Sequence, residues 1–181
     1  MAAITGSEIL SKLSTTAGSA GNSNTSTPGA SLGKYISTST IADATLNALF
    51  DDISGAENAA STVDYRCVFI HNSNAANALQ NAVIWLSAEV AGGASIAIGV
   101  DPTAASAIGS ASAQAVTIAN ENTAPAGVSF SSPTTAGTGL SLGTIPSGQC
   151  KAVWFRRTAA NSAALNSDGV TWSVQGDTGA A

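Results

Sequence analysis

Charged side chains are scarce in this chain of 181 residues, since Asp, Glu, Lys and Arg together make up 9% of the sequence, against roughly 25% in a typical soluble domain. Ala, Ser, Thr, Gly and Asn take their place, and only six residues are basic. The formal net charge is −5. This balance argues against a nucleic-acid partner, because binding to phosphates needs clustered Lys and Arg. A surface with so few charges does little to keep copies of the chain apart and therefore favours association.

Long apolar runs are also missing. The one uncharged stretch of about membrane-spanning length, residues 102–120, consists mainly of Ala, Ser, Thr and Gly and has little Leu, Ile or Phe to favour hydrocarbon. The N-terminal residues lack the basic region and apolar core of a secretion signal. We therefore expect no membrane partner and no secretion signal.

Cysteine is rare, with Cys67 and Cys150 as the two examples, and they form no CxxC pair. Each lies in or at the start of a predicted strand, so a cross-strand disulfide is geometrically conceivable. Without an export signal, two buried thiols are the favoured state.

The side-chain sets that catalysis requires are absent as well. His71 is the one histidine, so a zinc site would need distant carboxylates and a Ser-His-Asp triad would have to use His71. No Gly-x-Ser-x-Gly elbow, Walker loop or dinucleotide loop occurs. Asp51, Asp52 and Glu57 lack the alternating oxygen ligands and turn glycine of a calcium loop, and they are typical of a solvated helix end. We predict that the protein is not an enzyme and that it binds no metal, cofactor or small-molecule substrate.

What the sequence does contain is a β-pattern organised around residues 64–72, the densest apolar run, in which β-branched and aromatic residues dominate. Successive side chains of a strand point to opposite faces, and both faces here carry large apolar groups such as Phe69 and Ile70. We therefore predict that this strand is covered on both sides. The expected cover is an opposing sheet on one face and an arm, a loop or a neighbouring subunit on the other.

Further strands are predicted by alternation and by turn residues, at about 79–88, 94–100, 114–119, 127–131, 138–143, 150–157 and 169–176. No helix of 10–15 residues is predicted between them, which argues against a parallel α/β sheet. The pattern predicts an all-β fold, an antiparallel β-sandwich. A jelly roll is the first interpretation and an immunoglobulin-like sandwich is the second.

Residues 1–44 are predicted to form an extended N-terminal arm, and residues 45–181 the β-sandwich domain. Residues 14–33 are almost wholly Ser, Thr, Gly, Asn and Ala, and such a segment cannot bury enough apolar area by itself to offset the entropy of ordering. It is therefore a flexible tail on its own, or an arm that becomes ordered against a neighbour. A capping-box sequence at residues 5–8 predicts one or two helical turns before it.

One short helix is predicted after the arm, because apolar residues recur there with helical spacing at Leu46, Leu49, Phe50 and Ile53. Asp43 would be its N-cap and Gly55 its C-terminal stop. The alternative is an irregular apolar plug that lies across the end of the sandwich.

Three arginines lie in predicted strands and need partners there, because an unpaired buried charge is costly. Arg66 lies in the central strand, and its candidate partners are Glu57, Asp64 and Glu89. Arg156 and Arg157 end a later strand, where alternation sends them to opposite faces. Two interpretations stay open, a structural salt bridge within the chain and a salt bridge between subunits.

The large aromatic side chains of the predicted strands are expected to be core anchors rather than a platform for stacking sugars. They are Tyr65, Phe69, Trp85, Trp154 and Trp172. A sugar-binding module would have to expose at least two of the tryptophans on one face.

Several stretches resemble a family of structural proteins from the virions of tailed bacteriophages. They are residues 49–53 with Glu57, then 65–72, 95–101, 124–130, 145–148, 152–158 and 175–177. The resemblance spans roughly residues 45–178, and its motifs are turn and core patterns rather than catalytic ones. It implies a non-enzymatic virion component on the outer surface of the capsid, assembled in the host cytoplasm.

The role that fits this resemblance best is a capsid cement or decoration protein, which stabilises the phage head by bridging neighbouring capsid subunits. Its expected partners are the major capsid protein and copies of itself. A homotrimer would suit the local three-fold positions of an icosahedral shell, and multivalent binding lets weak contacts accumulate. The alternatives are a tail, neck or fibre component, a module that binds the host surface through the tryptophans, and a hydrolase.

Overall fold

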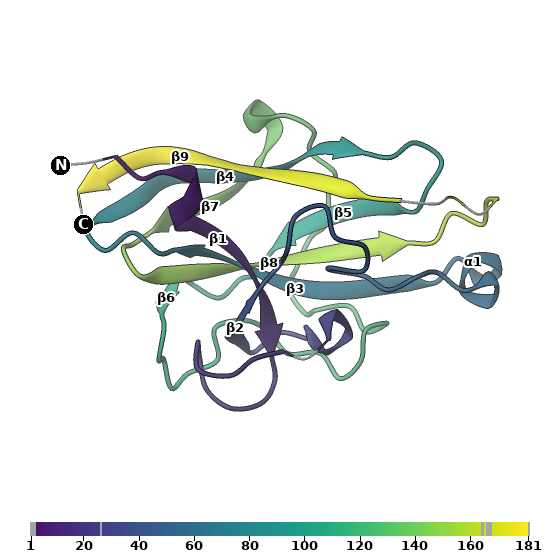
Figure 1. The fold of residues 1–181 in the computed structure, drawn as a ribbon, viewed down its shortest axis with the longest axis horizontal. Helices are drawn as coiled ribbons and strands as arrows, with labels where there is room; N and C mark the ends of the chain where they lie inside the picture. The colour runs from purple at the N-terminus through teal and green to yellow at the C-terminus, as the bar shows by residue number, and fades with distance from the viewer. Residues whose placement is uncertain (1–2, 26, 164, 166–167, 181) are drawn as a thin grey trace.

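The computed structural model describes residues 3–25, 27–163, 165 and 168–180 (Figure 1). These residues form two antiparallel sheets that pack as a β-sandwich, with one short α-helix, so the predicted fold class is confirmed. The larger sheet has the strand order β2-β1-β3-β8-β5, and β6 also pairs with β8. The smaller sheet has the order β7-β4-β9.

The strands of the larger sheet are β1 (Ile9–Thr15), β2 (Tyr35–Thr40), β3 (Val63–Asn72), β5 (Ser95–Val100), β6 (Ser106–Ala107) and β8 (Gln149–Thr158). Those of the smaller sheet are β4 (Asn77–Glu89), β7 (Leu140–Ile145) and β9 (Val170–Ala180). The helix is α1 (Gly55–Ala60), and single 3-10 turns are η1 (Gly6–Glu8), η2 (Pro28–Ala30) and η3 (Ala136–Thr138). From β3 onward the chain changes sheet at every connection except that between β5 and β6.

The main core lies between the two sheets. Strand β3 contributes Val68 and Ile70, and β8 contributes Val153 and Phe155, all fully buried. From the facing sheet, β4 contributes Ile84 and Leu86. Burying such side chains stabilises the fold by roughly 1.5–3 kcal/mol each, so this layer is the main source of stability.

A second core lies on the opposite face of the larger sheet. There the side chains of Cys67, Phe69 and Trp154 are fully buried, under loop segments that contribute Ala20, Ala115 and Ile118. In Figure 1 these loops lie beneath β3 and β8. The prediction that the central strand is covered on both faces is therefore confirmed, and within this chain the second cover is made of its own loops.

Buried polar groups hold the covering loops in place. The Asp101 carboxylate accepts hydrogen bonds from Trp154 Nε1 (2.8 Å), from the Val116 N–H (2.9 Å) and from the Thr103 N–H (2.8 Å). The Lys151 ammonium donates to the carbonyls of Asp101 and Thr103, and burial lowers the pKa of Lys151. Because Asp101 is 1% exposed, each of these donors offsets part of the cost of burying its charge.

The N-terminal segment differs from the predicted arm, because two strands of the larger sheet lie in it. β1 pairs with β3 from Ile9↔Asn72 to Leu13↔Val68, and β2 pairs with β1. The physical reason is backbone pairing supported by buried hydroxyls: Ser31 Oγ donates to Cys67 O (2.6 Å) and accepts from the Ser14 N–H (2.7 Å). A boundary between residues 44 and 45 therefore does not separate an arm from the sandwich. Residues 1, 2 and 26 of that segment lie outside the described residues.

The predicted helix between an N-cap at Asp43 and a stop at Gly55 is wrong, and the helix instead begins at Gly55, in α1. Positive φ angles at Ala44 (52°) and Asn47 (58°) interrupt any helical turn there. The N-cap of α1 is Ser54, which forms a capping box with Glu57. Residues 41–53 fit the alternative interpretation, an irregular apolar plug, because they form no regular element and Ile41 and Leu49 are buried in the main core.

The predicted strands at 114–119 and 127–131 are wrong as well. Both segments belong to the covering loops and make single bridges only, Gly33↔Thr117 and Ile98↔Ser131. Their alternating apolar residues, such as Ile118 and Val128, face the second core instead of a sheet partner. Cys67 and Cys150 are both buried free thiols, as predicted.

Replacing Trp154 with Phe should destabilise the fold by roughly 1–3 kcal/mol, because it removes one hydrogen bond from the buried Asp101 carboxylate. Urea unfolding measures this. Trp85→Phe is the matched control, since Trp85 lies on the outer face of the smaller sheet and is only partly buried. Equal losses for the two variants would contradict the role of the Trp154–Asp101 bond.

Candidate functional site

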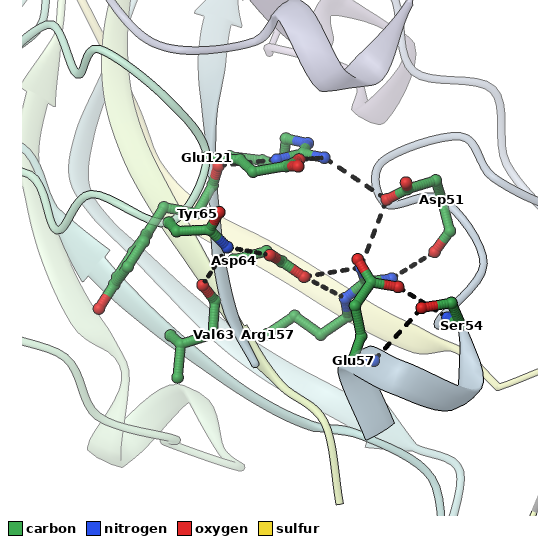
Figure 2. Close-up of polar contacts among 10 residues, drawn as sticks. Asp51, Ser54, Glu57, Val63, Asp64, Tyr65, Glu121 and Arg157 are labelled. Carbon is green, nitrogen blue, oxygen red and sulfur yellow. Dashed lines mark hydrogen bonds and ion pairs between the residues drawn. The ribbon is translucent and has the colours of Figure 1, made fainter. Parts of the chain in front are cut away.

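The larger sheet brings together the charged side chains of Asp64, Arg66 and Arg157 at the end of the sandwich next to α1 (Figure 2). At this place β1 has left β3, and loop backbone takes its position: the Cys67 N–H donates to Ser31 O and the Tyr65 N–H to Glu121 O. We call Arg66, Arg157, Asp51, Asp64 and Glu121 the arginine cluster.

Arg157 forms the inner half of the arginine cluster. Its Nη2 lies 2.7 Å from Asp64 Oδ2 and 3.3 Å from Asp51 Oδ1. Its Nη1 donates to the Asp51 carbonyl. The register Asp64↔Arg157 makes the first contact a direct cross-strand pair.

Arg66 forms the outer half. Its Nη2 lies 2.5 Å from Glu121 Oε2 and 3.5 Å from Asp51 Oδ1, and its Nη1 donates to Tyr65 O (3.1 Å). The guanidinium groups of Arg66 and Arg157 lie 5.4 Å and 4.8 Å from the centroid of the Phe50 ring. Asp51, 66% exposed, therefore links both arginines from the solvent side.

The arginine cluster joins four segments: the 41–54 loop, β3, β8 and the loop around Glu121. Its two guanidiniums are 1% and 7% exposed, and three carboxylates surround them. A buried pair of this kind is costly to break, because removing one partner leaves the other charge uncompensated. The effect of these ion pairs is to hold the four segments of the chain together. A groove of about 540 Å³ runs past the arginine cluster, lined by both polar and apolar groups, with Asn47, Asn120 and Asn122 among the polar ones.

The sequence identified the arginines but not all of their partners. Glu57 belongs to the cap of α1, where hydrogen bonds from Ser54 lower the pKa of Glu57. Glu89 accepts from the Ile96 N–H. The third candidate partner, Asp64, pairs with Arg157, and Arg66 instead contacts Asp51 and Glu121. No sequence signal could have found Glu121, because it lies 55 residues away in a loop.

Arg156 points to the opposite face from Arg157, as alternation requires. Its guanidinium lies 5.2 Å from the centroid of the Phe130 ring. No carboxylate of the described residues forms an ion pair with it.

The five expected core anchors fall into three groups. Phe69 and Trp154 are fully buried in the second core, and Tyr65 packs there against Phe130 with ring centroids 5.5 Å apart. Trp172 packs in the main core against Phe155, with centroids 4.9 Å apart. Trp85 alone of the three tryptophans lies on an outer sheet face, so no two of them form an exposed platform.

His71, Cys67 and Cys150 have pKa values that burial shifts toward the uncharged form. Burial, and secondarily Lys12, lower the pKa of His71. Burial raises the pKa of Cys150 to about 12 and also raises that of Cys67, which keeps both thiols protonated and unreactive. Among the described residues, no three His, Cys, Asp or Glu side chains are grouped to hold a metal ion.

Acidic side chains are the most exposed charged groups of the described residues. Of the six basic residues, Arg66, Lys151 and Arg157 are buried, and Lys12, Lys34 and Arg156 are partly buried. The exposed charged residues are all acidic: Asp43, Asp51, Asp52, Glu89, Asp168 and Asp177.

Most of these acids gather at the α1 end of the sandwich. Asn58 of α1 donates to Ser162 O, and Ser162 Oγ donates to Gly92 O. These bonds bring the end of β4, at Glu89, and the loop before β9, with Asp168, to the same end as α1. We call this end the acidic end.

Comparison of the chain with models of protein families, with curated proteins and with solved structures finds no match. In the part of the chain that the structure describes, no helix has the length and apolar character to span a membrane.

Replacing Arg157 with Met should lower the free energy of unfolding by roughly 3–5 kcal/mol, because the Asp64 carboxylate, 4% exposed, would lose its main counter-charge. Arg156→Met is the matched control on the next position, and it should cost at most about 1 kcal/mol. Adding Asp64→Asn to Arg157→Met should recover part of the loss in a double-mutant cycle. Equal costs for the two arginine variants would contradict a structural role of the cluster.

Stability should also fall as the pH drops below the ordinary His value of 6.5, because the folded-state pKa of His71 is lowered. Below that pH the unfolded chain binds a proton at His71 that the folded chain does not bind. The contribution of neutral His71 to the free energy of unfolding is therefore present above that pH and lost below it. Glu8 and Glu57 act in a separate window, below 4.5, where their folded pKa values are also lowered. Urea unfolding from about pH 7 to about pH 5 should show a slope that His71→Gln removes; an unchanged slope would refute the assignment.

Proposed function

We propose that this chain is a non-enzymatic structural protein of a bacteriophage particle, a capsid cement or decoration protein on the outer surface of the head. It would bridge neighbouring capsid subunits and lie beside copies of itself. The proposal is supported by the resemblance of residues 45–178 to virion proteins and by the properties of the surface.

The observation that carries the proposal is the distribution of charge. Three of the six basic side chains, Arg66, Arg157 and Lys151, are buried inside the fold, and the other three are only partly exposed. Neighbouring molecules can therefore approach through large uncharged areas and bury few ionic groups, which are the costly ones to desolvate. Such weak contacts stabilise a shell because many of them act together.

The way in which the protein would bridge subunits follows from the fold. Since β1 and β2 are strands of the sheet, bridging would depend on the outer surfaces of a rigid sandwich. A rigid domain loses little conformational entropy on binding.

Particles assembled without this protein should release their genome at a lower temperature, and more readily under osmotic shock, than particles that carry it. The measurement is genome release followed with a DNA-binding dye, with particles reconstituted with purified protein as the control. On the order of hundreds of copies per particle is expected for a decorated head. Equal robustness with and without the protein, or about a dozen copies per particle, would count against the capsid role; the low copy number would favour a tail, neck or fibre component.

A further inference from the structure

The loop between β2 and α1 presents the most exposed large apolar side chain in the described part of the chain. Leu46 is 73% exposed, whereas Val90, Ile108 and Leu165 are 37–43% exposed. Single exposed apolar residues are common on protein surfaces, so the exposure of Leu46 carries an argument only together with the loop around it.

That loop is held firmly at both ends. At its start, the Ile41 N–H donates to Ser11 O (2.9 Å). At its end, Leu49 is buried in the main core, Phe50 lies beside both guanidiniums, and Asp51 is bound to Arg157. Leu46 is therefore presented from fixed anchors, which lowers the entropy lost when it docks.

The backbone around Leu46 is in an unfavourable conformation. Ala44 has a φ angle of 52°, in the left-handed region that is costly for a residue such as Ala, and Asn47 has a φ angle of 58° in the same region, which Asn tolerates. A helix with the spacing of Leu46, Leu49 and Phe50 would have turned all three to the core. The two left-handed residues, one on each side of Leu46, instead turn it outward. Unfavourable local geometry of this kind is typical of functional sites.

The charges around Leu46 define what can bind it. Asp43, Asp51 and Asp52 are exposed in the same loop, and Asp43 and Asp52 take part in no ion pair of the described residues. A second copy of this chain is a poor partner, because three of its six basic side chains are buried and the other three, Lys12, Lys34 and Arg156, lie on separate segments and are only partly exposed. The complementary surface belongs to a different protein and carries Lys or Arg around an apolar pocket.

We infer that residues 42–52 are a docking loop, in which Leu46 enters an apolar pocket of another protein and Asp43 and Asp52 face basic side chains at its rim. The inference rests on the proposed function for the source of that protein, which is then a subunit of the capsid shell. Leu46 has the arrangement of an interface hot spot, an apolar anchor surrounded by polar groups.

Heads assembled without this protein test the inference when purified protein is added back and binding is measured by co-sedimentation. Leu46→Ser should weaken binding about tenfold or more, and Asp43→Asn with Asp52→Asn should weaken it and reduce its dependence on salt. The matched controls are Val90→Ser, another exposed apolar residue, and Asp177→Asn, an exposed acid on β9. Both should bind as the unaltered chain does.

The outcomes separate the inference from the proposed function. Full binding by the Leu46→Ser protein, or equal weakening by Val90→Ser, would overturn the docking loop while the capsid role stands. Failure of the unaltered chain to bind the heads at all would overturn both. Urea unfolding of each variant shows that it is folded; substitution of so exposed a side chain as Leu46 should leave the unfolding midpoint unchanged.

Discussion

The pairing of β3 with β8 is the interaction on which the rest of the structure depends. The two strands pair from Val63↔Thr158 to His71↔Cys150, and each carries large apolar side chains on both faces. A sheet of this kind cannot leave either face in water without exposing several large side chains. The fold therefore needs two covers. The smaller sheet supplies one, and the loops around residues 16–34 and 101–131 supply the other.

The second cover shows how a chain rich in small polar residues can bury an apolar face. Segments made of Ser, Thr, Ala and Gly bring little apolar area of their own, so burial alone does not fix their position. Buried hydrogen bonds do so instead: Gln114 Oε1 accepts from the Ile36 N–H, and Ser31 bonds both β1 and β3. Such bonds are individually modest, but each is expensive to leave unmade, and together they select one arrangement of the loops.

The parts of the fold that could be predicted are those that depend on the residue pattern within a single strand. The central strand, the strands near 79–88 and 150–157, and the two-sided burial of Phe69 and Ile70 follow from apolar alternation. The N-terminal strands did not follow, because a strand such as Tyr35–Thr40 contains one large aliphatic residue and becomes a strand through pairing with β1. The capping box at Thr5 does form, but as a single turn that leads into β1 instead of a longer helix. In both places tertiary pairing overrides local preference.

For the arginines, too, some features could be predicted from the sequence and others could not. The need for partners could be predicted from burial, and so could the opposite directions of Arg156 and Arg157. Asp64, the partner of Arg157, lies directly across from it on the neighbouring strand. Asp51 and Glu121, the partners of Arg66, lie in loops whose path no local sequence pattern predicts. Loop positions depend on long-range closure, which periodicity does not report.

The burial of Arg66 and Arg157 also affects the charge of the protein surface. Each buried guanidinium is a positive charge that the surface lacks, whereas an acid that pairs with it, such as Asp51, stays exposed to solvent. An interior stabilised in this way leaves an exterior that is neutral or negative. Two copies of the chain would repel each other at the acidic end, and less so across the part of the smaller sheet's outer face where Trp85 lies beside Ser87 and Ser173. The same ion pairs that close the sandwich therefore restrict which of its surfaces can meet another copy and which require a partner of opposite charge.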